Sequence, residues 1–254
     1  MPLDEADVPK IIQVADGVFV RQEVDNIGWI DMGEYAIIVD AMEQPSAEGE
    51  VIDAIEETLG GKGVRYVLNT HSHYDHVALN EAFRRRWGAT IVGQAIAPLP
   101  SAGRVFEGAR RRAVMLPMPG THTEEDCIVH LPGDRVLFTG DIFGWGLIPL
   151  TTNLRADTAA MLLTTYERMI DLDAAVVIPG HGPLCTTAQL RRWVAYFGWL
   201  CDQVRAAVAA GRSDAEILAL APPDDMRPWW RFLKWKHADC VAKVLKGFRK
   251  GWLE

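Results

Sequence analysis

The sequence predicts an α/β fold, because short apolar runs of strand length alternate along it with longer segments of helical pattern. Its 254 residues are enough for one sizeable hydrophobic core. No Ser/Gly-rich tract, long block of charge or internal repeat divides the chain. We therefore expect one domain over residues 1–254, with residues 186–254 mostly helical.

Several of the expected strands end at a glycine or begin after one. The apolar segment at residues 65–69 follows Gly60, Gly61 and Gly63, which bound it as a buried strand. In chain order, the expected elements are strands and a turn at 26–30 and 32–33, a strand at 65–69, a helix at 78–87, strands at 113–118 and 127–131, strands ending near residues 140 and 179, and a terminal helix within 226–254.

The segment His71-Ser72-His73-Tyr74-Asp75-His76 places four metal-binding side chains within six residues. It lies on the loop between the strand at 65–69 and the following helix. Such a loop can aim several side chains at one point while the scaffold holds both of its ends. Imidazole suits zinc, and a carboxylate is a usual companion ligand, so one loop can serve two ions.

Three later strands end in the same way, with a glycine beside a possible ligand. His122 follows Gly120, Asp141 follows Gly140 and His181 follows Gly180. Glycine lets the backbone turn sharply where a side chain must enter a crowded site. Five of the seven histidines belong to these motifs and the 71–76 segment, which indicates a metal site.

On these residues the chain resembles the metallo-β-lactamase superfamily, whose signature His-Xaa-His-Xaa-Asp-His is matched by residues 71–76. The likeness covers residues 11–183 and implies a four-layered αββα sandwich with metals at one edge, followed here by a C-terminal helical segment. It also implies the ligand set. A first metal would bind His71, His73 and His122, a second would bind Asp75, His76 and His181, and Asp141 would bridge them.

The third motif departs from the family pattern, because Thr121 separates Gly120 from His122. The register into the strand at 127–131 still favours His122, whereas His130, inside that strand, is expected to pack or face solvent. The acidic run at residues 124–126 is expected to be a solvated turn.

The implied chemistry is hydrolysis by a dinuclear site. Two adjacent dications lower the pKa of a bridging water from near 16 toward about 7, so that hydroxide attacks at neutral pH. Asp75 is the expected catalytic residue, because a metal-bound carboxylate can also orient the attacking water. Five imidazoles and two carboxylates without a thiolate suit two zinc ions, with manganese or iron as alternatives.

The substrate is the open part of the prediction. We expect a small ester, lactone, thioester or β-lactam, and a glyoxalase-type thioesterase is less favoured because no C-terminal glutathione-binding pattern is evident. The alternatives are a phosphodiesterase or nuclease using the same metals, an iron-dependent redox protein, and a non-catalytic binding protein. Trp29 and Trp145 suit either a pocket wall or the core, and Tyr74 either a substrate contact or packing.

The net charge bears on the partners of the protein, and the spacing of the cysteines bears on their redox state. A net charge of −8 disfavours nucleic acid. The basic stretch at 226–254 is expected to pack its apolar side on the domain, with a dimer interface or an anion-attracting rim as alternatives. The arginine triplets at 84–86 and 110–112 are expected to be solvated. The four cysteines lack Cys-Xaa-Xaa-Cys spacing and are expected to be reduced, with a structural role for Cys185.

The N-terminus and the hydropathy pattern bear on location. Residues 1–5 lack the basic stretch and the apolar core of a signal peptide, and no segment is long and apolar enough to span a bilayer. We therefore expect a cytoplasmic protein that acts on a small molecule, without a membrane partner.

Overall fold

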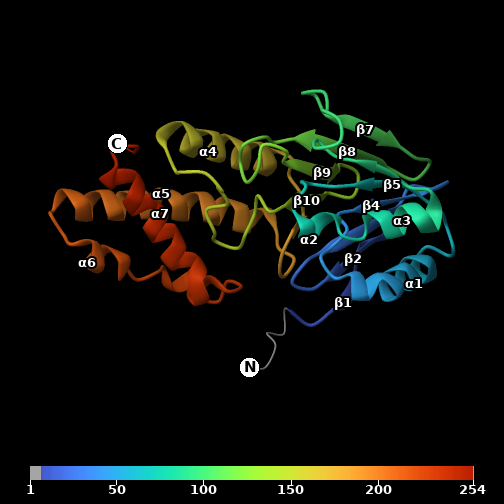
Figure 1. Ribbon diagram of the computed structural model, residues 1–254, viewed down its shortest axis with the longest axis horizontal. Coiled ribbons are helices and arrows are strands. Elements are labelled where there is room, and N and C mark those ends of the chain that lie inside the picture. The colour runs from blue at the N-terminus through green and yellow to red at the C-terminus, as the bar shows by residue number, and fades with distance from the viewer. Residues whose placement is uncertain (1–6, 254) are drawn as a thin grey trace.

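A computed structural model describes residues 7–253 of the chain, in two β-sheets packed face to face between helices (Figure 1). The strands are β1 (Lys10–Ala15), β2 (Val18–Gln22), β3 (Ile27–Asp31), β4 (Ala36–Val39), β5 (Val64–Leu68), β6 (Thr90–Val92), β7 (Arg104–Glu107), β8 (Arg112–Pro117), β9 (Cys127–Leu131), β10 (Val136–Gly140) and β11 (Val176–Pro179). The α-helices are α1 (Glu48–Thr58), α2 (Tyr74–Val77), α3 (Asn80–Trp87), α4 (Ala156–Asp171), α5 (Thr187–Ala209), α6 (Asp214–Leu218) and α7 (His237–Arg249).

The first sheet has the order β1-β2-β3-β4-β5-β6 and the second the order β11-β10-β9-β8-β7. Strands β4, β5 and β6 are parallel, and β10 is parallel to β11, whereas the other neighbours are antiparallel. The inner faces of the two sheets enclose one apolar layer that includes Val20, Ile37, Met115 and Phe138. Removing these faces from water is the main force that joins the sheets.

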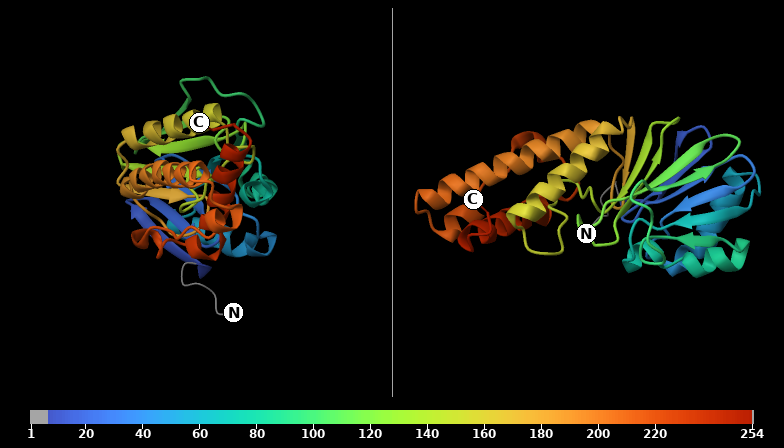
Figure 2. Two further views of the ribbon diagram at one scale, coloured as in Figure 1. Left: turned by 90° about the vertical axis from the view of Figure 1, so that its left-hand side faces the viewer. Right: turned by 90° about the horizontal axis from the view of Figure 1, so that it is seen from above.

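Helices cover both outer faces of this pair of sheets (Figure 2). On the first sheet, Val51 and Ile55 of α1 and Phe83 of α3 pack with Trp29 and Ile38. On the second sheet, α4 and α5 pack on Leu137 and Val177. The αββα sandwich and the C-terminal helices expected from the sequence are both confirmed.

The C-terminal helices extend beyond the sheets to one side of the molecule (Figure 1). Helix α5 begins with a capping box in which Thr186 and Gln189 bond each other's backbone amides. Val241, Val244 and Leu245 of α7 are buried in the core shared with α5. The prediction that the terminal helix packs its apolar side on the domain is therefore confirmed.

Two expected helices have different bounds in the structure. The helix expected at 78–87 begins at Asn80, and residues 74–77 form the separate turn α2, so that part of the metal-binding segment is itself helical. The terminal helix begins only at His237. Before it, Arg231 has a left-handed backbone (φ 54°), and a π-helix, labelled η4, spans Phe232–Lys236. π-Helices are rare in proteins, and those that occur are often found at functional sites.

Of the two alternatives for Trp29, a pocket wall or the core, the structure shows the core. It is fully buried in β3, and its Nε1 donates a hydrogen bond to Thr58 Oγ1 (2.8 Å). The arginines at 84–86 are exposed, as expected. Cys127, Cys185 and Cys240 are buried thiols and Cys201 is half-buried.

None of the helices described within residues 7–253 is long and apolar enough to cross a membrane. The segment at residues 1–5, on which the expectation about a signal peptide depends, lies outside the described residues.

Candidate metal centre

The predicted ligands come together because the strands that carry them end at the same edge of the two sheets. Strand β8 is antiparallel to β9, which is antiparallel to β10, so β8, β10 and β11 point in one direction. The loops after them carry His122, Asp141 and His181. The loop after β5 of the other sheet and the first residues of α2 carry residues 71–76.

Two groups of ligand atoms form at this edge, and each group spans no more than 4.8 Å. The first holds His71, His73, His122 and Asp141. The second holds Asp75, His76, His181 and Asp141. All seven residues predicted as ligands are in these groups, and Asp141 belongs to both. His130 lies apart from them near the end of β9, where it is buried.

Asp141 lies between the two groups. Its Oδ2 is 3.6 Å from His122 Nε2 and 3.2 Å from His181 Nε2, and its Oδ1 is 3.2 Å from His76 Nε2. Asp75 Oδ2 lies 3.2 Å from His181 Nε2. The carboxylate of Asp141 is thus within reach of an ion in either group.

The orientation of the imidazoles fits metal binding. Nδ1 of His122 meets Pro149 O (2.7 Å), and Nδ1 of His181 meets Val24 O (3.0 Å), so that Nε2 of each ring faces the cluster. His71 Nε2, His76 Nε2 and Asp141 Oδ1 are buried and make no hydrogen bond of good geometry with a described residue, although the last two atoms lie 3.2 Å apart. Buried polar atoms without partners are rare, and here they converge on the two groups. A pair of cations would satisfy all of them.

The pKa values of several ligand residues favour the protonation state that a metal ion requires. Burial, with the charge of His76, lowers the pKa of His71 to about 2, so this imidazole is neutral as a metal requires. The hydrogen bond from His181 lowers the pKa of Asp75 to about 2. Burial would raise the pKa of Asp141, but the charges of His181 and His76 outweigh it and hold that pKa well below its usual range. Both carboxylates are therefore ionised at neutral pH.

His76 and His181 carry protons that a cation would replace. Burial lowers the pKa of His76, but Asp141 and Asp40 outweigh it and raise the pKa to about 10. The pKa of His181 is also raised, chiefly because Asp141 offsets its burial. Metal binding at the second group should therefore release protons.

Two carboxylates behind the ligands were not predicted from the sequence. Asp40 Oδ2 lies 3.0 Å from His76 Nδ1, and Asp25 Oδ1 lies 3.1 Å from His181 Nδ1. Such outer partners fix the tautomer and orientation of a metal-binding imidazole. Asp40 had a usable signal, because it directly follows strand β4, as Asp141 directly follows β10. Asp25 had none, because it pairs with a residue 156 positions away.

The acidic run at 124–126 is only partly a solvated turn. Glu124 is exposed, but Asp126 is buried and accepts hydrogen bonds from the backbone amides of His122 and Thr123. Glu125 accepts a hydrogen bond from Ser72. The expectation for Asp126 is therefore wrong, because its carboxylate satisfies amides in the turn that presents His122.

Replacing Asp40 by Asn should weaken metal binding at the second group by about 10- to 100-fold, because His76 loses its charged partner. Asn tolerates the left-handed backbone of this position (φ 62°), so the fold should remain. The measurement is a competition titration with a metal chelator. Asp173→Asn, at an exposed left-handed position (φ 50°), is the matched control. Unchanged affinity in D40N would contradict the role given to Asp40.

A cavity of about 340 Å³ opens over the two groups. Its lining includes the ligands Asp75, His122, Asp141 and His181. The C-terminal part of the chain adds Trp230, Arg231, Trp235 and Lys236 to the same wall. These last four residues were not predicted as part of the site, because the basic stretch that holds them was expected to be a packing helix.

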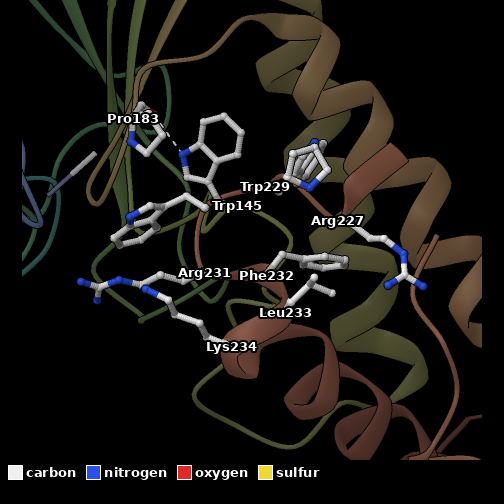
Figure 3. Close-up of a pocket in the computed structure, with 10 residues that line it drawn as sticks. Trp145, Pro183, Arg227, Trp229, Arg231, Phe232, Leu233 and Lys234 are labelled. Carbon is white, nitrogen blue, oxygen red and sulfur yellow. Dashed lines mark hydrogen bonds between the residues drawn. The ribbon is translucent and has the colours of Figure 1, made fainter. Parts of the chain in front are cut away.

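A second cavity, of about 330 Å³ (Figure 3), shares the lining residues Trp230 and Arg231 with the first. Trp145, which suited either a pocket wall or the core, is mostly buried and lines this second cavity, where its Nε1 donates to Pro183 O (2.9 Å). Tyr74 is 59% exposed and lines neither cavity.

Comparison with known proteins agrees with this geometry. The sequence profile described as "Metallo-beta-lactamase superfamily" matches residues 21–116 and 100–181, which include all seven ligand positions. The hydroxyacylglutathione hydrolase of Rhizobium meliloti (strain 1021) is 33% identical over 144 residues, covering 53% of this chain and 54% of that protein. The enzyme of the same name from Brucella ovis is 29% identical over 130 residues, covering 47% of this chain and 49% of that protein. The chain thus spans about half the length of the curated relatives it matches.

Solved structures share the fold at low sequence identity. A metallo-beta-lactamase from Pontibacter korlensis covers 74% of this chain and 98% of its own, with a TM-score of 0.62 and 17% identity. The stereoselective inverting sec-alkylsulfatase Pisa1 from Pseudomonas sp. covers 96% of this chain and 50% of its own, with a TM-score of 0.73 and 13% identity. The second likeness extends the shared fold into the C-terminal helices.

Proposed function

Because this chain belongs to the metallo-beta-lactamase superfamily, we propose that it is a dinuclear metal-dependent hydrolase of a small carbonyl substrate, namely an ester, lactone, thioester or β-lactam. The observation that carries the proposal is the pair of ligand groups that share Asp141. Two bound dications would lower the pKa of a water, supply hydroxide at neutral pH and polarise the scissile carbonyl.

The residues of the chain would position the reactants. Asp75 is ionised and lines the cavity, so it can accept a hydrogen bond from the attacking water and hold its lone pair toward the carbonyl carbon. Asp141 would fix the distance between the two groups. Asp40 and Asp25 would keep His76 and His181 in the tautomer whose Nε2 faces the cluster.

The donor set suits zinc. Five imidazoles and two carboxylates without a thiolate are typical zinc ligands, and manganese or iron also accept mixed nitrogen and oxygen donors. We propose two zinc ions, one for each group.

The size of the cavity and the relatives favour a small substrate. A volume of about 340 Å³ is at the lower end of ordinary small-molecule pockets. Among the four substrate classes, the curated relatives named hydroxyacylglutathione hydrolase raise the thioester to first place, although the sequence shows no glutathione pattern. A small-molecule substrate, the absence of a nucleic-acid or membrane partner, a cytoplasmic location and a homodimer all stay predictions.

A substrate panel with metal analysis tests this proposal. Zinc-loaded protein should turn over at least one of an aryl ester, a γ-lactone, an acyl-glutathione thioester and a β-lactam. His71→Ala should lower that turnover by about 100-fold or more, because it removes a ligand rather than an outer partner. His130→Ala, which removes a buried imidazole outside both groups, should keep it.

Three outcomes would overturn the proposal. No turnover in any class that depends on His71 would refute hydrolysis of these substrates. Turnover of a bis-aryl phosphodiester alone would support the phosphodiesterase alternative. Iron in protein purified without added metal, with a matching absorption spectrum, would support the redox alternative.

A further inference from the structure

Lys236 is a buried cation in the wall of the metal cavity. The proposed hydrolytic chemistry assigns it no role. Only 2% of the residue is exposed, yet it lines the cavity together with the second-group ligands Asp75 and His181. It is the last residue of the π-helix η4. Lysine is almost never fully buried without a partner, because desolvating an ammonium group costs several kcal/mol.

The contacts of Lys236 leave part of its ammonium group available to a ligand. Its Nζ donates one hydrogen bond, to Gly144 O (2.7 Å), and lies 4.1 Å from the centre of the Trp230 ring. Among residues 7–253 no carboxylate forms an ion pair with it. An ammonium group carries three donors, so two of them are not used by this hydrogen bond.

A second cation stands beside Lys236, but it is already neutralised. Arg231 also lies over the Trp230 ring, with its Cζ 4.5 Å from the ring centre, and its guanidinium donates a hydrogen bond to Asp7 Oδ2 (2.7 Å). Asp7 also accepts a hydrogen bond from Trp230 Nε1 (2.9 Å). The left-handed backbone of Arg231 is costly for a residue other than glycine, and such strain is often kept where it positions a site.

The acidic residues of the cavity are engaged elsewhere or stand at its rim. Asp25 pairs with His181, and Asp75 and Asp141 belong to the ligand groups. Glu43 is exposed. Lys236 is therefore the cation of this cavity whose charge is not neutralised by an ion pair with a described residue.

We propose that Lys236 is an anion-binding residue that selects substrates carrying a carboxylate, with the apolar part of the substrate against Trp230 and Trp235. This inference rests on the proposed function, because it names the substrate class of that site. Trp235 is 47% exposed and lines the cavity, so it would contact a ligand that reaches solvent. Trp230 packs directly on Gly182, next to the ligand His181, which places this wall beside the second group.

The charge of Lys236 should make anion binding depend on pH. Burial lowers its pKa to about 7, with a further decrease from Arg231, whereas Cys240, Asp141 and Asp7 act in the opposite direction. The ammonium form is thus present below about pH 7 and is lost above it. A bound carboxylate stabilises that form, so carboxylate affinity should fall as pH rises from 6 to 9.

The test compares phenylacetate with its neutral analogue phenylacetamide on zinc-loaded protein, by isothermal titration calorimetry and by tryptophan fluorescence. The wild type should bind phenylacetate about 30-fold or more tightly than phenylacetamide at pH 6, because truncating one partner of a buried charge pair has an effect of this size. Lys236→Met should abolish the preference. Lys236→Arg should keep the preference, and its affinity for phenylacetate should not fall above pH 7.

Lys243→Met is the matched control. Lys243 also donates to a carbonyl of the same loop, at Ile148 (3.0 Å), but it does not line the metal cavity. It should keep the wild-type preference, and the thermal unfolding midpoints of all variants should be compared. Equal binding of both probes to the wild type would overturn the proposal, as would a preference that survives in K236M, which would place the carboxylate on zinc. Neither readout requires turnover, so a failure of the hydrolase assays is a separate result.

Discussion

Replacing Asp141 by Asn should lower the metal content at both groups at once and reduce hydrolysis by about 100-fold or more. Outer-shell partners of a metal ligand typically contribute 10- to 100-fold, and Asp141 is the residue common to both ligand groups. Asn has the same shape but no charge, so it cannot offset the charge of two cations. Metal bound per chain should be measured after dialysis, together with turnover of the best substrate of the panel.

Two further variants are compared with D141N: His122→Ala, which should affect one group, and Asp202→Asn, which should affect neither. His122 belongs only to the first group, so its loss should mainly empty one site. Asp202 forms an exposed ion pair with Arg205 (2.8 Å), and its replacement should change neither metal content nor turnover. Two metals retained per chain in D141N would show that Asp141 does not bridge the groups.

Replacing Gly180 by Ala should damage the second metal group although Gly180 contributes no ligand. A methyl group at this position would overlap Asp141 Oδ1 and lie 2.8 Å from His76 Cε1. The backbone around residue 180 is held by hydrogen bonds to Gly140 and Asn26, so it cannot easily move away. We expect metal affinity at the second group to fall by at least about 10-fold, the lower end of the effect of disturbing a ligand's surroundings.

Gly198→Ala is the matched control for this substitution. Gly198 lies on the exposed side of α5, and a methyl group there would have no neighbour within 4 Å. Alanine should stabilise that helix by about 1 kcal/mol without affecting the metals. A chelator titration of both variants decides the point, and wild-type metal affinity in G180A would show that the site adapts to the added methyl.

The ligands could be predicted from the sequence because their signals are local. A strand of β-branched and apolar residues, a glycine and a histidine or aspartate lie within a few positions of one another three times along the chain, and residues 71–76 follow a fourth strand directly. Parallel strands then bring such loops to one edge of the fold. The resemblance carried by residues 71–76 added which residues belong to which metal, and the two observed groups have that composition.

The residues around the ligands could not be predicted in the same way. The pairs of Asp40 with His76 and of Asp25 with His181 join positions 36 and 156 residues apart. Asp126 has the composition of a surface turn, but its carboxylate is buried against the amides that it satisfies. For Asp25 and Asp40 the partner lies far along the chain, although the position of Asp40 directly after β4 was a usable signal. The partners of Asp126 are only three and four residues away, and what its composition does not show is its burial.

The C-terminal stretch shows this division most clearly. The sequence by itself predicted an α/β fold and seven candidate metal ligands, because short-range periodicity, glycines and ligand spacing are properties of the local chain. The resemblance carried by residues 71–76 added the metallo-β-lactamase fold. Only the tertiary structure decided that Trp230, Arg231 and Lys236 line the metal cavity. The left-handed turn at Arg231 and the π-helix after it depend on packing against the 144–146 loop and on the contact with Asp7, and no pattern within residues 226–254 encodes those contacts.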